Sequence, residues 1–195
     1  AYEKAIASMK IVTTSTVVVP SLKVKVLNDF MSFITEFPEY ESALLEVTNT
    51  VSANTPSRSD LEWADYYYNQ KAYLKAIYSY EKALEYDPDN FTIIKNLALL
   101  YLETNQFETA VLFTNNQMEL YPSQPILYLV NGTANKQLDH LDMAIETLSM
   151  GLDYIYDNKK LQHDFYRQLS TTFQLQGNIE ASETFTKKAM ALENN

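Results

Sequence analysis

The sequence predicts an all-α protein made of stacked antiparallel helix pairs, and three observations predict this class. Alanine recurs at Ala76, Ala110 and Ala144, at two successive intervals of 34 residues. Pro88 and Pro122 are separated by the same interval. A fixed period of this length is typical of repeats that each contain two helices. Other positions share the register: Trp63 with Leu97 and Asn131; Ala64 with Ala98 and Gly132; Tyr67 with Tyr101 and Asn135; Tyr73 with Phe107 and Leu141.

The large and small residues of this register explain how one pair of helices packs. Antiparallel helices approach closely only where a small residue faces a large one. Ala64 and Ala76 are therefore the expected holes, and Trp63, Tyr67 and Tyr80 the expected knobs. A proline after the second helix ends it, because proline cannot continue the hydrogen-bond ladder.

This pattern resembles the tetratricopeptide repeat family, whose second helix carries an alanine, an aromatic residue, a second alanine and a proline. Ala76, Tyr80, Ala83 and Pro88 match that set. The resemblance implies a right-handed α-solenoid, with four repeats at 57–90, 91–124, 125–158 and 159–195. The fourth needs a four-residue insertion around residues 157–160, and there Ser182 and Ala181 compete for one slot. The departures from the family pattern are Thr114, Gln117, Asn131, Asn135 and Tyr156.

Residues 1–56 are expected to form a divergent helical region. Residues 2–6 read YEKAI and echo YEKAL at residues 80–84, so they are expected to belong to the second helix of a preceding unit. Residues 11–19 are β-branched and are expected to form a connector rather than a lone strand. Apolar residues at helical intervals then predict one helix pair between Pro20 and Val51. We therefore expect a fragment of a longer, bacterial array.

The composition limits the classes of function. The 195 residues are 46 % hydrophobic, which is enough for a folded core. The net charge of −10, with both signs interspersed, argues against nucleic acid and anionic membranes as partners. No run of apolar residues reaches the roughly 20 that a membrane span needs. The absence of cysteine leaves open a cytoplasmic location or a bacterial periplasm or envelope.

Few residues could carry catalysis, so we expect a non-enzyme without metal or cofactor. His140 and His163 have no second histidine one helical turn away, and both are expected to be solvated. The three glycines occupy slots for small or turn residues rather than a phosphate-binding loop. Asn131 and Asn135 are expected to bond each other, the backbone or water, with ligand binding as the alternative.

The resemblance also implies a concave surface, lined by the first helix of each repeat, that binds a peptide or a protein. A subgroup that grips a terminal carboxylate with basic residues is disfavoured, because Leu61, Asp65, Ile126 and Val130 occupy its polar slots, although Asn96 matches. The expected groove residues are Leu61, Asp65, Tyr68, Asn69, Lys95, Leu99, Leu102, Glu103, Leu129, Thr133, Lys136, Gln137, Arg167, Thr171, Gln174 and Leu175.

The expected function is a non-catalytic scaffold for protein interaction, and two alternatives stay open. The chain could be a structural spacer that associates end to end through an uncapped last helix. The apolar residues of that helix are Phe185, Ala189, Met190 and Leu192. It could also be a regulatory part of an enzyme encoded outside this segment.

Overall fold

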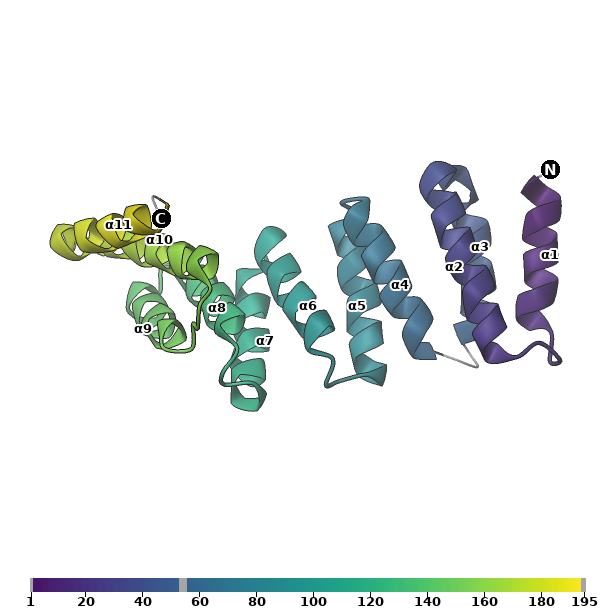
Figure 1. The fold of residues 1–195 in the computed structure, drawn as a ribbon, viewed down its shortest axis with the longest axis horizontal. Coiled ribbons are helices and arrows are strands. Elements are labelled where there is room, and N and C mark those ends of the chain that lie inside the picture. Colours follow the sequence, from purple (N-terminus) through teal and green to yellow (C-terminus); the bar gives the residue numbers. More distant parts are fainter. Residues whose placement is uncertain (1, 53–55, 194–195) are drawn as a thin grey trace. The chain divides into compact units, whose positions relative to one another are not determined.

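The structure is a computed structural model that describes residues 2–52 and 56–193, and the chain divides into two compact units, Ala1–Ile93 and Ile94–Asn195. Within the described residues the regular elements are eleven α-helices and one short 3₁₀ helix (Figure 1). The predicted all-α class of antiparallel helix pairs is confirmed. The repeat limits predicted above stay a prediction.

The first unit contains α1 to α5 and the 3₁₀ helix η1. Their bounds are α1 Tyr2–Thr14, α2 Pro20–Glu36, η1 Pro38–Tyr40, α3 Glu41–Ser52, α4 Pro56–Asn69 and α5 Tyr73–Tyr86. The rings of Phe33, Phe37 and Tyr40 surround that of Tyr2, with centroids 5.1 to 5.8 Å from it. Helix α1 therefore packs on the pair that follows it.

Helix α1 corrects one expectation. Residues 11–14, expected in a connector, form its last turn. Thr13 is 2 % exposed and donates its hydroxyl hydrogen bond to the Met9 carbonyl at 2.8 Å. Burial of this face against the rest of the unit outweighs the weak helix propensity of β-branched residues.

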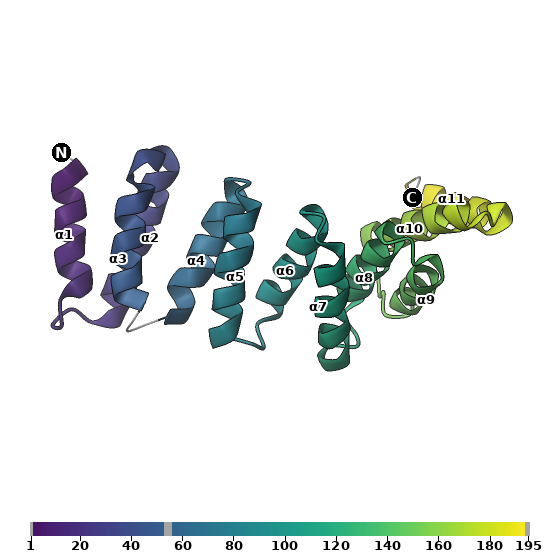
Figure 2. The ribbon, with the colours of Figure 1, turned by 180° about the vertical axis from the view of Figure 1, so that it is seen from behind.

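Helices α4 and α5 pack as the small-and-large pattern predicts. Ala64 and Ala76 are both fully buried, and Trp63, Tyr67 and Tyr80 are at most 5 % exposed. The ring of Trp63 stacks on that of Tyr67 with centroids 5.4 Å apart. Figure 2 shows the two helices side by side from the second viewpoint.

The second unit contains α7 to α11 and most of α6, which crosses the boundary between the units. The bounds are α6 Phe91–Glu103, α7 Phe107–Leu120, α8 Pro125–Gln137, α9 Leu141–Leu152, α10 Lys159–Gln176 and α11 Ile179–Glu193. Its core centres on Tyr128, Leu148, Phe165 and Leu169, which come from α8, α9 and α10.

The turn inside each pair from α4 onward has one geometry. Lys71, Asn105, Asp139 and Gly177 all adopt positive φ, between 58° and 84°. The next residue in each case donates its N–H to a carbonyl five positions back, at 2.8 to 2.9 Å. This is the Schellman ending of a helix. The first three positions are spaced by 34 residues, which confirms the periodicity.

The small residues of the register lie where helices touch. A Cβ on Gly132 would meet the Leu148 side chain, and one on Gly151 would meet Tyr128 and Phe165. In the last pair the small residues are serines: Ser170 Oγ lies 3.3 Å from Ser182 Oγ. Ser182 is 8 % exposed, so it occupies the slot for which Ala181 competed.

The last helix is less open than expected. Phe185 stacks on Phe173 of α10 with centroids 5.6 Å apart, and Ala189 is 5 % exposed. Met190, at 55 %, is the large apolar residue of α11 that remains exposed near its end. The apolar side of α11 is thus mostly covered by α10, because the two helices form a pair. End-to-end association stays a prediction.

None of the helices in the described part of the chain is both long and apolar enough to cross a membrane.

Candidate functional site

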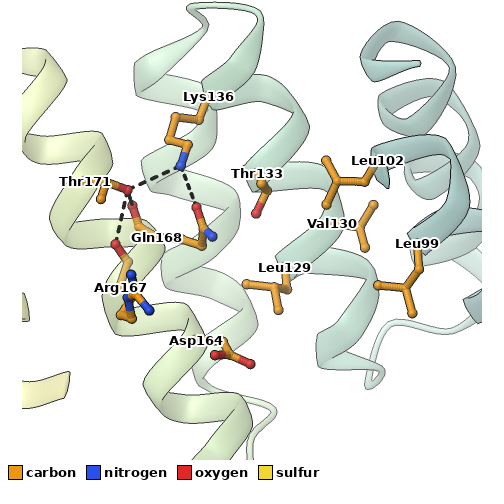
Figure 3. Close-up of a pocket in the computed structure, with 10 residues that line it drawn as sticks. All are labelled: Leu99, Leu102, Leu129, Val130, Thr133, Lys136, Asp164, Arg167, Gln168 and Thr171. Atoms are coloured by element: carbon orange, nitrogen blue, oxygen red, sulfur yellow. Dashed lines mark hydrogen bonds between the residues drawn. The ribbon is translucent and has the colours of Figure 1, made fainter. Parts of the chain in front are cut away.

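A cavity of about 450 Å³ lies in the second unit, where α6, α8 and α10 each present one face to it (Figure 3). Each of these helices is the first of its pair, so the side chains that reach the cavity recur at similar positions along successive pairs. The lining residues are Leu99, Leu102, Leu129, Val130, Thr133, Lys136, Asp164, Arg167, Gln168 and Thr171.

One side of the cavity is apolar. Leu99 and Leu102 reach it from α6, and Leu129 and Val130 from α8, as Figure 3 shows. Leu99 is 37 % exposed, whereas Val130 is fully buried and forms part of the floor. Half-exposed leucines above a closed floor offer an apolar surface that a ligand could cover.

The opposite side is polar and contains Lys136. Its Nζ donates to Gln168 Oε1 at 2.6 Å and to Thr171 Oγ1 at 3.3 Å. Both acceptors are neutral groups on α10. Burial lowers the pKa of Lys136 below its ordinary value, because the ammonium loses water without gaining a negative neighbour.

Asp164 and Arg167 complete the polar side. Asp164 Oδ1 lies 3.6 Å from Nδ1 of His163, whose Nε2 lies 2.8 Å from Glu193 Oε1. His163 is thus held between two carboxylates, which corrects the expectation of a merely solvated histidine; His140 is exposed. Among the described residues neither Lys136 nor Arg167 forms an ion pair with a carboxylate.

The predicted groove residues of the second unit divide into two sets. The cavity brings together Leu99, Leu102, Leu129, Thr133, Lys136, Arg167 and Thr171. It leaves out Lys95, Glu103, Gln137, Gln174 and Leu175. The residues missed are Val130, Asp164 and Gln168. Asp164 and Gln168 lie at helical spacing from the predicted Arg167 and Thr171, and this spacing would have identified them.

The first unit has a separate cavity of about 280 Å³ between α2 and α4. Asp65 and Asn69, two of the predicted residues, line it together with Tyr66. Tyr68 does not line it, because its ring lies against Tyr73 with centroids 6.0 Å apart. The cavity also includes Met31, Ser32, Thr35, Glu62 and Gln70.

The asparagine pair lies inside the second unit and is satisfied mostly by internal partners. Asn131 Nδ2 donates to Thr114 Oγ1 at 2.9 Å and to Asn115 Oδ1 at 2.8 Å. Asn135 Nδ2 donates to Asn131 Oδ1 at 2.8 Å. The expectation of internal bonding is confirmed. Asn135 Oδ1 is buried and accepts no hydrogen bond from the described residues.

No group of three or more metal-binding side chains (His, Cys, Asp or Glu) comes together in residues 2–52 and 56–193.

Comparison with known proteins defines the class of the fold. Residues 79–111 match the family model of the tetratricopeptide repeat. The comparison with curated proteins gave no match. Together with the helix pairs and their 34-residue turns, the family match confirms the predicted resemblance to the tetratricopeptide repeat family.

Solved structures agree with this class. MamA of AMB-1 has a TM-score of 0.66 at 19 % identity, over 86 % of this chain and 98 % of its own. MamA from Desulfovibrio magneticus RS-1, residues 41 to the end, has a TM-score of 0.67 at 16 % identity, over 87 % and 94 %. YrrB, described as a TPR protein with an unusual peptide-binding site, has a TM-score of 0.67 at 17 % identity, over 100 % and 93 %. At these identities the likeness is one of fold.

Proposed function

We propose that the chain is a non-catalytic scaffold for protein interaction, and that the cavity between α6, α8 and α10 binds a segment of a partner protein or a peptide. One observation carries the proposal: three successive first helices converge on one cavity with leucines on one side and hydrogen-bonding groups on the other. Repeat proteins commonly use the surface formed by equivalent helices in this way. YrrB, which has a similar fold, is described as having a peptide-binding site.

The chemistry of the lining favours a peptide. Leu99, Leu102 and Leu129 can receive apolar side chains, and such anchors supply most of the affinity in helix-and-groove recognition. Thr133 and Gln168 offer hydrogen bonds to a peptide backbone. Apolar anchors with a few polar groups that fix orientation are the usual composition of a binding site.

The test is affinity capture from an extract, with the chain and two leucine variants as baits. Leu99→Asp places a carboxylate among the leucines of the cavity and should weaken binding by about 2 kcal/mol, a loss of roughly thirtyfold. Leu112→Asp is the matched control, because Leu112 is 68 % exposed on α7 and does not line the cavity.

Partners retained by the Leu112→Asp bait and lost by the Leu99→Asp bait would support the proposal. Identical partner lists for all three baits would place the binding surface elsewhere. Circular dichroism of each bait controls for loss of helix.

A further inference from the structure

We propose that this cavity selects an acidic partner segment, in which one Asp or Glu side chain lies beside apolar residues and pairs with Lys136 and Arg167. The inference rests on the function proposed above and specifies its partner. It follows from the charges that line the cavity and from their arrangement relative to the leucines.

The first argument is the geometry of Lys136. An ammonium group has three N–H donors, and two of them are used by Gln168 and Thr171 at 2.6 and 3.3 Å. Removing a charge from water is costly unless an opposite charge compensates. Because both present acceptors are neutral, an incoming carboxylate would supply the missing compensation through the third N–H.

The second argument is the balance of charge. Lys136 and Arg167 line the cavity, and neither is in an ion pair within the described part of the chain. The single acid of the lining, Asp164, faces His163 at 3.6 Å. The cavity therefore has a positive lining in a chain whose net charge is −10. Complementary charge of this kind determines which partner is accepted.

The third argument is the separation of the two sides. Figure 3 shows Lys136 and Arg167 toward α10, Leu99 and Leu102 on α6, and Leu129 between these two groups on α8. A segment that fills the cavity thus needs its carboxylate and its apolar side chains on different sides. A lysine or arginine in the place of the carboxylate would meet two like charges, so basic segments are rejected.

The experiment selects binders from a phage library of random 12-residue peptides on the whole chain and on three variants. Lys136→Met removes the ammonium and keeps most of the side-chain length. Lys95→Met is the matched control, since Lys95 lies on α6 outside the cavity. Leu99→Asp reports on the cavity as a whole. Selected peptides are then synthesised, and their Kd values are measured by fluorescence anisotropy.

We expect the chain and Lys95→Met to enrich peptides with Asp or Glu close to Leu, Ile or Phe. Lys136→Met should bind such a peptide roughly tenfold more weakly. Changing the peptide's acidic residue to its amide should cost the chain a similar factor. The same change should cost Lys136→Met little, because the pair would already be broken.

Two other outcomes separate the inference from the proposed function. Peptides that are lost on Leu99→Asp but show no acidic preference, or bind Lys136→Met as well as the chain, would overturn the charge selection and leave the groove in place. Equal selection on the chain and on Leu99→Asp, or none on either, would overturn both.

Discussion

At the scale of single residues, Gly151 lies where α9 packs closely on its neighbours. A Cβ there would be 2.5 Å from Tyr128 Cβ and 2.6 Å from Phe165 Cε1. The first of these atoms is fixed to the backbone of α8, so it cannot move without the helix. At Gly132 a Cβ would instead meet Cγ and Cδ2 of Leu148 at 2.5 and 2.9 Å and the Ala144 carbonyl oxygen at 3.2 Å.

Gly151→Ala should therefore destabilise the protein. Overpacking costs about 1–3 kcal/mol, whereas alanine gains about 1 kcal/mol in helix propensity over glycine. The contact with the α8 backbone should make the clash dominate, with a net loss of about 1–2 kcal/mol. Urea unfolding followed by circular dichroism measures the difference. Ser149→Ala, at an exposed site on the same helix, is the control; equal stability of both variants would show that α8 and α9 can separate freely.

Single residues also show where sequence reasoning succeeded and failed. The burial of the small residues Ala64, Ala76 and Gly132 could be predicted, because only a small side chain fits where two helices pack closely. On α4 the sequence predicts Tyr68 as a groove residue, whereas the cavity of the first unit is lined by Tyr66; three consecutive tyrosines look alike in sequence. The ring of Tyr68 lies against that of Tyr73 instead.

At the scale of elements, the turns within the pairs carry a conformational cost. Lys71, Asn105 and Asp139 adopt positive φ without being glycine, whereas the fourth turn has Gly177. A left-handed conformation costs an L-residue about 1–2 kcal/mol. Asparagine and aspartate tolerate it better than most, so Lys71 is the least suited of the four.

Lys71→Gly is expected to stabilise the first unit by about 0.5–1 kcal/mol, after the extra entropy that glycine loses on folding is subtracted. Gly177→Ala should destabilise the second unit by about 1 kcal/mol for the reverse reason. Space is not an obstacle there, because a Cβ would meet nothing within 4 Å. Thermal unfolding of both variants measures the effects, and shifts of the same sign would contradict this account.

Elements without the 34-residue register were harder to predict. Residues 11–14 looked like a connector because β-branched residues disfavour helices weakly, yet their burial in α1 decides the outcome. The apolar side of α11 looked uncovered for a different reason. Periodicity shows that Phe185 and Ala189 share a face, but it does not show which neighbour covers that face.

At the scale of the whole molecule, the acidic composition and 15 tyrosines determine the response to alkaline pH. Burial, followed by the proximity of Glu41, raises the pKa of Tyr67 well above its ordinary value of 10.0. The Tyr67 hydroxyl donates to Glu41 Oε1 at 3.1 Å, and Lys75 Nζ donates to the same oxygen at 2.8 Å.

The sign of the pH dependence follows. Tyr67 keeps its proton in the folded chain while the unfolded chain ionises near pH 10, so the free energy of unfolding should fall as pH rises above about 10. Tyr67→Phe should reduce this fall. Urea unfolding at pH 8 and pH 10.5 measures it, with Tyr156→Phe as the control because Tyr156 is 95 % exposed. An unchanged fall in Tyr67→Phe would assign the alkaline sensitivity to other tyrosines.

The predicted limit at residue 56 and the boundary between the two compact units are different kinds of division. Loss of the register suggested a limit at residue 56, whereas the two compact units meet between Ile93 and Ile94, inside α6. The limit at residue 56 marks where similarity to the repeat pattern begins. The boundary between Ile93 and Ile94 marks where contacts between residues are fewest. Sequence periodicity carries no information on contact density, so the predicted repeat limits remain to be tested.

The constancy of the turns has a consequence for how such a chain can change in length. Residues 70–72, 104–106 and 138–140 join the helices of a pair by segments of equal length. The segments between pairs vary, from residues 87–90 and 121–124 to the longer 153–158, and α10 is itself 18 residues long. Insertions, whether they arise in evolution or by engineering, are therefore best accommodated at 153–158. Residues added there do not change the turns that join the two helices of each pair.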